Sequence, residues 1–402
     1  MNTKQLIAIE DKYGAHNYKP LDVVITRAKG IWVWDVEGKK YLDFLSAYSA
    51  INHGHCHPRI VKALQTQAKK LTLTSRAFRN DQWPLLAKEL CQITGYEMVL
   101  PMNSGAEAVE TALKTARKWA YQKKGIPQDK AEIIACANNF HGRTITIIGF
   151  STEPLYRNDF GPFTPGFVVI PFGDTEALER AITPNTAAFL VEPYQAEAGI
   201  LMPSPGYLKK AKDICEKNNV LLIADEIQTG LGRTGKLFAY EHEGIKPDMI
   251  IVGKSLGGGC IPISVVLSSA EILGVFKPGE HGSTFGGNPL ACAVAREALR
   301  IIKDERLVQR EEKLGKYFLA KLKTIKSRSI KEVRGTGLLI GIELFREAGG
   351  ARKYCEALMK VGLLCKETHD DVIRFAPPLV IEKKDLDWAF ERIRDVFHKL
   401  DS

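Results

Sequence analysis

Short apolar runs alternate with amphipathic segments through the middle of the chain, from about residue 58 to residue 300. The apolar runs are rich in Val and Ile and end in polar or turn-forming residues: EMVLPMN, AEIIACAN, GFVVIP, AAFLVEP, VLLIADE, MIIVGK and ISVVLSS. Between them lie segments with helical periodicity, such as AEAVETALKTARKWAYQ and GYLKKAKDICEKN. This alternation predicts an α/β fold, with a mostly parallel sheet covered by helices on both faces.

The pattern changes on either side of this region. Residues 1–57 hold short β-like pieces, DVVITRAKG and IWVWDVEGKKYLDFL. After about residue 300 come a helix (EEKLGKYFLAKLKTI), strand candidates (SIKEVRG, LLIGIEL, GLLCKET and VIRFAPP) and a final helix (DLDWAFERIRDVFHKL). We therefore predict an N-terminal segment (1–57), a large domain (58–300) and a smaller C-terminal α+β domain (301–402) packed on the large one.

The composition is that of an ordinary globular protein, with 45% hydrophobic and 26% charged residues in a chain of 402. The net charge is +9, but Lys and Arg are spread along the chain and interleaved with Asp and Glu. We find no basic arm and no aromatic-basic RNA motif, which argues against nucleic-acid binding. A mild attraction for dicarboxylate substrates fits this charge better.

The cysteine pattern favours a reducing compartment. The chain has eight cysteines: Cys56, Cys91, Cys136, Cys215, Cys260, Cys292, Cys355 and Cys365. None of them forms a CxxC pair, and several lie in apolar runs, as buried thiols do. The N-terminal residues carry acidic groups and lack an apolar core of signal length. No run approaches the roughly 18 apolar residues of a membrane span. These features predict a cytoplasmic protein with no membrane association.

The only dense histidine cluster is His53-Gly-His55-Cys56-His57. It leads straight into a helix-like segment, PRIVKALQTQAKKL, and no carboxylate lies nearby in the sequence. We therefore expect no metal site there.

Two strand candidates end abruptly in charged groups. VLLIA is followed by Asp225 and Glu226, and MIIV is followed by Gly253 and Lys254. Ligands of open α/β sheets bind at the carboxyl ends of the strands, so these charges would meet at one edge. Burying a lone lysine is costly, which favours a chemical role for Lys254. The alternative is a surface lysine whose chain lies along apolar groups.

A second interpretation of Gly253-Lys254-Ser255 is a phosphate-binding P-loop. That motif needs a glycine five residues before its second glycine, with a flexible loop between. Position 248 is Asp, and the intervening residues are the strand itself. This excludes the P-loop.

The run EMVLPMN leads into Ser104, Gly105 and Ala106 and then a helix. Small residues at such a turn leave free backbone N–H groups at a helix N-terminus, where an anion is favoured. These three residues are therefore candidates for holding a phosphate. Ser104 with Glu107 also fits a capping box, and the two roles are compatible.

Two more strand ends complete a set of groups. AEIIACANN is followed by Phe140 and Arg143, and AAFLVEP reaches Glu192, with Glu197 shortly after. Together the strand ends offer a phosphate cradle, an aromatic ring, a carboxylate and a lysine. Pyridoxal phosphate needs all four, because it has a phosphate, a flat ring, a ring nitrogen that must stay protonated and an aldehyde that condenses with an amine.

The chain resembles the class III (ω-amino acid) aminotransferases, which have the type I pyridoxal-phosphate fold. The resemblance covers about residues 15–395 and is carried by ADEIQTGLGRTG, GKSLGGG, MNSGAEAVETALK, NNFHGRT, HGSTFGGNPLAC and RGTGLLIGIEL. It implies that Lys254 binds the cofactor aldehyde covalently and moves a proton on the substrate, and that Asp225 pairs with the ring nitrogen. The other implied cofactor contacts are the ring-stacking Phe140, Gln228 at the ring hydroxyl, and Gly105 and Ala106 at the phosphate. The resemblance also implies a homodimer with active sites at the subunit interface, in which Ser283 and Thr284 of the neighbouring subunit reach the phosphate.

Within the family, HNYKPL, LSAYSAINHGHCHP, LTLTSRAF, VEPYQAEAG and VIRFAPPLVI resemble the members that act on ornithine. The implied reaction transfers the δ-amino group of ornithine to 2-oxoglutarate by a ping-pong mechanism. Arg374 would bind the α-carboxylate of the dicarboxylate, and Glu197 would mask Arg374 while ornithine is bound. Arg143 would bind the distal carboxylate, and Tyr18 and Tyr48 would orient ornithine. The structural alternatives are a surface arginine for Arg374 and a core aromatic for Tyr48.

Other functions stay open at this point. The close alternative is another ω-aminotransferase, acting on acetylornithine or 4-aminobutyrate. A pyridoxal-phosphate mutase or racemase would need no second carboxylate clamp, so Arg374 and Arg143 count against it. A binding or scaffold protein leaves the charged strand ends unexplained. One departure concerns the ring-stacking motif, which has His141 after Phe140 where the animal ornithine enzymes carry Trp.

Overall fold

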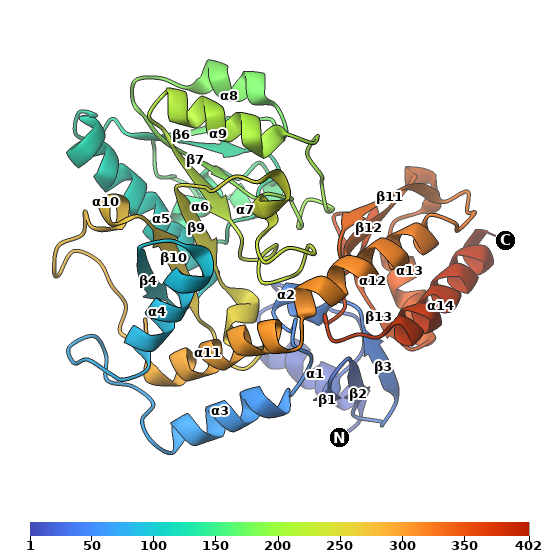
Figure 1. The fold of residues 1–402 in the computed structure, drawn as a ribbon. Helices are drawn as coiled ribbons and strands as arrows, with labels where there is room; N and C mark the ends of the chain where they lie inside the picture. Colours follow the sequence, from blue (N-terminus) through green and yellow to red (C-terminus); the bar gives the residue numbers. More distant parts are fainter. Residues whose placement is uncertain (402) are drawn as a thin grey trace.

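The middle of the chain forms one seven-stranded sheet, in the order β4-β10-β9-β8-β7-β5-β6 (Figure 1). The computed structural model describes residues 1–401. The strands correspond to the apolar runs singled out in the sequence: β4 Met98–Met102, β5 Glu132–Cys136, β6 Phe167–Ile170, β7 Thr186–Val191, β8 Leu221–Asp225, β9 Met249–Val252 and β10 Ser264–Ser268. Strand β10 is antiparallel to both neighbours, and the other adjacent pairs are parallel. The predicted mostly parallel sheet is confirmed.

Helices cover both faces of this sheet, as predicted. Ile223 and Ile251 share a core with α5 (Gly105–Trp119) on one face. On the other face, Leu222 packs with α9 (Tyr207–Lys217) and Ile250 with α11 (Pro289–Asp304). The remaining helices of this region are α3 Pro58–Ala68, α4 Trp83–Thr94, α6 Ile145–Gly149, α7 Pro154–Arg157, α8 Thr175–Ala181 and α10 Ala270–Leu273, with the short π-helix η1 Ala120–Lys124 and the 3-10 helices η2 Ala239–Glu243 and η3 Lys254–Gly257.

The C-terminal part has its own antiparallel sheet, in the order β11-β12-β15-β14. Its elements are β11 Ile330–Thr336, β12 Leu339–Leu344, β14 Lys366–Thr368, β15 Val372–Phe375, η4 Arg346–Ala348, α12 Leu307–Leu322, α13 Arg352–Lys360 and α14 Lys383–Asp401. Apolar side chains of the sheet and of α12, α13 and α14 belong to the same core as α11. This part therefore packs against the large sheet's helices, and the α+β character is as predicted.

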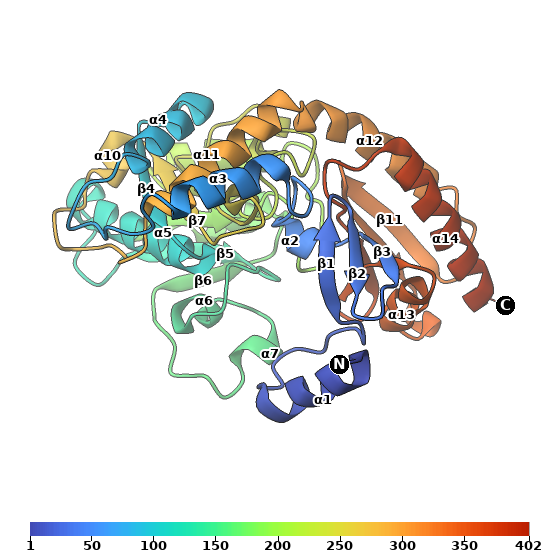
Figure 2. The ribbon, with the colours of Figure 1, turned by 90° about the horizontal axis from the view of Figure 1, so that it is seen from below.

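Three N-terminal strands, which lie together in Figure 2, form a third sheet with a short C-terminal strand, in the order β1-β2-β3-β13. Its elements are β1 Ile25–Lys29, β2 Trp32–Asp35, β3 Lys40–Asp43 and β13 Leu363–Leu364, preceded by α1 Thr3–Tyr13 and followed by α2 Ser46–Ser49. The expectation that GLLCKET is one strand was wrong. The chain leaves β13, passes through the buried Cys365 and enters β14 in the other small sheet. The predicted boundaries near residues 57 and 300 stay a prediction.

The histidines of the HGHCH run bind three separate partners. His53 Nε2 lies 3.0 Å from the carbonyl oxygen of Ala298, and His55 Nε2 lies 2.7 Å from Asp43 Oδ2. His57 Nε2 lies 3.0 Å from Oε1 of Glu305, the residue that follows α11.

Within residues 1–401, no helix is long and apolar enough to cross a membrane.

Candidate active site

The charged strand ends meet in one cavity of about 230 Å³ at the carboxyl edge of the large sheet. Its walls come from the segments that follow β4, β5, β7, β8 and β9: Gly105, Ala106, Phe140, His141, Gly142, Glu192, Tyr194, Glu197, Asp225, Ile227, Gln228, Thr229 and Lys254. The sequence predicted this convergence from the strand ends alone, but His141, Tyr194, Ile227 and Thr229 were not assigned a role.

Lys254 directs its amine into this cavity. The residue follows β9 and has a φ of 45°, in the left-handed region that is costly for a residue with a side chain. Its Nζ donates a hydrogen bond to Gln228 Oε1 at 2.8 Å. Burial lowers the pKa of Lys254, while the charges of Glu197 and Asp225 oppose that shift. A surface lysine at a strand end is therefore excluded, and the amine is placed for chemistry.

Asp225 is the buried carboxylate at the end of β8, with 5% of its surface exposed. Its Oδ1 accepts a hydrogen bond from the backbone N–H of Ile227 at 3.1 Å. Its Oδ2 lies 2.7 Å from Nδ1 of His141, whose side chain is fully buried. His141 therefore orients the carboxylate from behind. Sequence reasoning missed this role, and the only signal was its place between Phe140 and Gly142.

Glu192, at the end of β7, holds the backbone of Phe140. Its Oε2 accepts the N–H of Phe140 at 3.0 Å. Burial, together with the nearby charge of Asp225, raises the pKa of Glu192 well above its ordinary value. This shift favours the protonated form of Glu192 more than in an ordinary glutamate. The ring of Phe140 meets Tyr156 edge-on, with 5.9 Å between ring centroids.

The phosphate candidates lie at the start of α5. Ser104 is the N-cap, and both hydrogen bonds of the capping box with Glu107 are present, at 3.2 Å and 2.8 Å. The predicted capping role is confirmed. Gly105 and Ala106 line the cavity, and the first N–H groups of a helix have no acceptor within it. A Cβ on Gly105 would lie 3.0 Å from Cδ1 of Ile227, so the helix start packs closely against this side chain. Ser104 itself is exposed and lies outside the cavity wall.

Ser283 and Thr284 do not line the cavity of their own chain. Ser283 Oγ accepts a hydrogen bond from Asn103 Nδ2 at 2.7 Å, next to the turn that begins α5. Thr284 is exposed. Their predicted role toward the phosphate of a neighbouring subunit stays a prediction.

Arg374 and Glu197 form an ion pair beside the cavity, in which the arginine is buried and the glutamate partly buried. Arg374 is 1% exposed and its Nη1 donates to Glu197 Oε1 at 2.8 Å. Burial acts to raise the pKa of Glu197, but the charges of Arg374 and Lys254 outweigh it and hold the pKa below its ordinary value. The Arg374 guanidinium lies 4.6 Å from the ring centroid of Tyr48, which is half-buried. A surface arginine is excluded, and Tyr48 contacts the candidate substrate clamp instead of only filling a core.

Arg143 and Tyr18 lie farther out. Arg143 is exposed, and its guanidinium lies 4.5 Å from the ring centroid of Tyr156, 5.7 Å from that of Tyr18 and 5.8 Å from that of Phe140. Tyr18 is 70% exposed. The structure thus brings these two predicted residues together near Phe140, outside the cavity wall.

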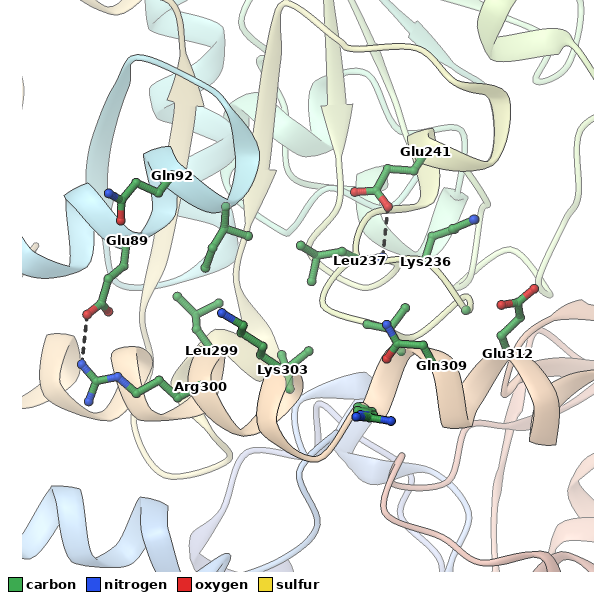
Figure 3. A pocket seen from close by; sticks show the side chains of 15 residues that line it. Glu89, Gln92, Lys236, Leu237, Glu241, Leu299, Arg300, Lys303, Gln309 and Glu312 are labelled. Carbon is green, nitrogen blue, oxygen red and sulfur yellow. Dashed lines mark hydrogen bonds and ion pairs between the residues drawn. The ribbon is translucent and has the colours of Figure 1, made fainter.

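A larger cavity, of about 1090 Å³, lies elsewhere, between α4, α11, α12 and the turn η2 (Figure 3). It contains none of the candidate residues. Glu89 pairs with Arg300 at 3.0 Å, and Glu241 accepts the N–H of Leu237 at 3.2 Å. This cavity lacks the combination of a helix start, an aromatic ring, a buried carboxylate and an amine, so the candidate site is assigned by its chemistry and not by its volume.

The small cavity has the donor set that pyridoxal phosphate requires. It combines free N–H groups at a helix start, an aromatic ring, a buried carboxylate and an amine, all at one sheet edge.

Comparisons with known proteins agree with this chemistry. A family model described as aminotransferase class-III matches residues 13–397. The ornithine aminotransferases of Brevibacillus brevis and Bacillus subtilis are 61% and 59% identical to this chain, each over 98% of both chains. The solved ornithine aminotransferase from Toxoplasma gondii, described with partial occupancy of PLP at its active site, superposes with a TM-score of 0.98 at 49% identity, covering 99% of this chain and 95% of that one. An acetylornithine aminotransferase from Elizabethkingia anophelis superposes with a TM-score of 0.90, also at 49% identity, over 99% of this chain and 100% of that one.

Proposed function

The chain belongs to the class-III aminotransferase family, and from this membership we propose that it transfers the δ-amino group of ornithine to 2-oxoglutarate, giving glutamate-5-semialdehyde and glutamate. The observation that carries the choice of substrates is the ion pair between Glu197 and Arg374, 2.8 Å long, in the same region as Lys254. With this pair, one site can have two states. In one, Glu197 neutralises Arg374, and in the other Arg374 is free to bind a substrate carboxylate.

The cofactor of this family, pyridoxal phosphate, fits the cavity. Lys254 would bind it covalently, Gly105 and Ala106 would hold its phosphate through backbone N–H groups, and Phe140 would cover one face of its ring. Gln228, within 2.8 Å of the Lys254 amine, would bind the ring hydroxyl. When bound, the cofactor supplies an aldehyde that condenses with amines and a ring that withdraws electrons.

Two residues handle protons in this proposal. When the cofactor is bound, Asp225 would hold a proton on its ring nitrogen, because a negative charge at close range favours the protonated form. Lys254 would take the proton from the substrate carbon that carries the amine, a role for which a base of lowered pKa is suited. Because its pKa is lowered, the Lys254 amine loses its proton at a lower pH than the amine of an ordinary lysine.

Arg374 and Glu197 would let one site accept both ornithine and a dicarboxylate. While ornithine is bound, Glu197 pairs with Arg374 and cancels its charge, and Tyr48 and Tyr18 orient the far end of ornithine. When the dicarboxylate binds, its α-carboxylate replaces Glu197 on Arg374 in a bidentate pair, and Arg143 binds the distal carboxylate. Arg143 is exposed, so it is free to turn toward an entering substrate.

The proposal includes a homodimer in the cytoplasm. Thr284 and the neighbouring Phe285, which is 55% exposed, belong to a segment that touches the start of α5 through Ser283. A second copy that covers this segment would bring Ser283 and Thr284 of the first copy to the phosphate site of the second.

The cytoplasmic location is proposed from the cysteines. Free thiols are typical of proteins from a reducing compartment. Five of those in this chain are buried: Cys136, Cys215, Cys292, Cys355 and Cys365.

A half-reaction screen tests the choice of substrate. The pyridoxal form of the protein is mixed separately with ornithine, acetylornithine and 4-aminobutyrate, and the loss of its visible absorption band is followed. We expect ornithine to react fastest, because an acylated or absent α-amino group leaves Tyr18 and Tyr48 without their partner. Fastest conversion of acetylornithine would contradict the proposal in favour of the function named for the Elizabethkingia anophelis enzyme.

A Lys254→Ala variant is the control for the chemistry in this screen. It should show neither the absorption band of the covalently bound cofactor nor measurable transamination with any of the three amines. Full transamination in this variant would contradict the role of Lys254.

A further inference from the structure

Glu197 lies at the tip of a short loop between Gln195 and Leu201. These two residues form an isolated antiparallel bridge, with hydrogen bonds of 3.2 Å and 3.0 Å that close the base of the loop. Ile200 has a φ of 56° and is fully buried, so the loop holds a conformation that a β-branched residue rarely adopts. Such a conformation persists only when its surroundings hold it in place.

The contacts that hold this loop come from the C-terminal sheet. Arg334, on β11, donates from Nη2 and Nε to the carbonyl oxygen of Gly199, at 2.8 Å and 3.1 Å, and from Nε to that of Ile200, at 3.1 Å. Thr368, on β14, donates its hydroxyl to the carbonyl oxygen of Glu197 itself. The backbone of the loop is thus held at Glu197 itself and at Gly199 and Ile200, while the Glu197 carboxylate pairs with Arg374.

Arg334 is itself held rigidly. Its Nη1 pairs with Glu332 Oε2 at 2.7 Å and also with Glu343, and the side chain is 10% exposed. Two carboxylates therefore fix one edge of the guanidinium and aim the other edge at the loop carbonyls. A lysine could not make these contacts together, because it lacks the planar fork of donors.

We propose that Arg334 is a positioning residue that sets how firmly Glu197 masks Arg374, and thereby the balance between ornithine and the dicarboxylate substrates. This inference rests on the function proposed above. Because the loop backbone is pinned, only the Glu197 side chain turns when a carboxylate enters, and it returns to the same place afterwards. Without Arg334 the loop backbone is no longer held in this position, so the ion pair between Glu197 and Arg374 weakens. A substrate carboxylate then competes for Arg374 more easily.

The experiment compares two measurements in the holoenzyme with Arg334→Gln. The first is kcat/KM for the half-reaction with ornithine, and the second is the Kd of glutarate, a dicarboxylate without an amino or keto group, measured by calorimetry on the pyridoxal form. We expect the ornithine value to fall about tenfold, since hydrogen bonds from a charged donor are lost. Glutarate should bind several-fold more tightly, so the variant gains affinity for the dicarboxylate while it loses activity with ornithine. A merely structural role would weaken both.

Lys331→Gln is the matched control. Lys331 lies on the same strand and pairs with the same carboxylate, Glu343, at 2.5 Å, but no contact with the loop is present. This variant removes the same charge and should leave both values unchanged. Arg334→Lys, which keeps the charge, should fall between the wild type and Arg334→Gln, and it serves if Arg334→Gln does not fold.

Two results would overturn the inference. One is an equal loss for ornithine and glutarate in both Arg334 variants, and the other is a change in Lys331→Gln as large as that in Arg334→Gln. Failure of the wild-type protein to react with ornithine at all is a separate outcome, because it contradicts the proposed function before any variant is compared.

Discussion

At the scale of single residues, the charge of Asp225 is the feature on which the proposed chemistry depends most. The carboxylate receives hydrogen bonds from the backbone of Ile227 and from His141, and both hold it in one orientation. Beside it lies Glu192, whose burial raises its pKa well above the ordinary value and so favours its neutral form. Replacing Asp225 by Asn removes a carboxylate while the shape of the side chain is kept.

We expect Asp225→Asn to bind pyridoxal phosphate but to react with ornithine roughly 100-fold more slowly, because a ring nitrogen without the nearby charge loses its proton more readily. The measurement is the single-turnover rate with ornithine, with the visible spectrum of the bound cofactor recorded between pH 6 and pH 9. Asp225→Glu keeps the charge and is the control. A wild-type rate for Asp225→Asn at neutral pH would show that the carboxylate is not needed.

The sequence was enough to predict Asp225 and Lys254, because each ends an apolar run and strand ends share one edge of a sheet. It was not enough for His141 or Arg334. The bond between His141 and Asp225 joins residues 84 positions apart, and the contact between Arg334 and Gly199 joins residues 135 positions apart. Such pairs depend on how separate segments pack, and nothing in the local pattern of either segment indicates its partner.

At the scale of helices and strands, periodicity predicted what each segment becomes better than where it goes. The strands of the large sheet follow directly from their apolar runs, and the start of α5 follows from its capping box. The division of GLLCKET between two sheets could not be predicted. Its apolar residues fit a single strand, and only the positions of β3 and β15 decide that β13 pairs with one and β14 with the other.

Helix α11 shows how one side chain ties an element to its surroundings. His53 lies against this helix, with Nε2 3.0 Å from the carbonyl oxygen of Ala298, and is 1% exposed. Burial lowers the pKa of His53 from 6.5 to about 4. Below pH 6.5 the unfolded chain therefore takes up a proton that the folded protein refuses until about pH 4, so the free energy of unfolding falls as the pH drops through this window.

We expect His53→Gln to remove this part of the pH dependence while its side-chain amide still donates to Ala298. At pH 5 the wild-type protein should have lost about 2 kcal/mol that it has at pH 7, and the variant should keep that amount. Thermal unfolding midpoints at pH 5, 6 and 7 provide the measurement. His16, an exposed histidine 2.7 Å from the carbonyl oxygen of Asp11, is the matched site, and His16→Gln should follow the wild type. Parallel curves for His53→Gln and the wild type would refute the prediction.

At the scale of the whole molecule, the candidate active site lies where two sheets meet. The amine and the carboxylate that face the cofactor follow strands of the large sheet, whereas Arg374 lies on β15 of the C-terminal sheet. Glu197 connects the two, since its loop follows β7 and its side chain and backbone both contact the C-terminal sheet. The relative position of the sheets therefore enters the specificity of the site, while the residues of this chain that form the cofactor wall end or follow strands of the large sheet.

Subunit mixing tests whether a second copy of the chain completes that wall. We expect Lys254→Ala to be inactive in its own site, and Thr284→Asp to weaken cofactor binding in the partner's site by placing a carboxylate near the phosphate. In a mixed dimer, one site then has both Lys254 and a partner with Thr284, and the other has neither. Unfolding and refolding the two variants together in equal amounts should restore about a quarter of the wild-type activity per site, since half of the dimers are mixed and each has one intact site. If Thr284 acted within its own chain, every site would keep at least one defect and mixing would restore nothing, so the recovered activity decides which subunit holds the phosphate.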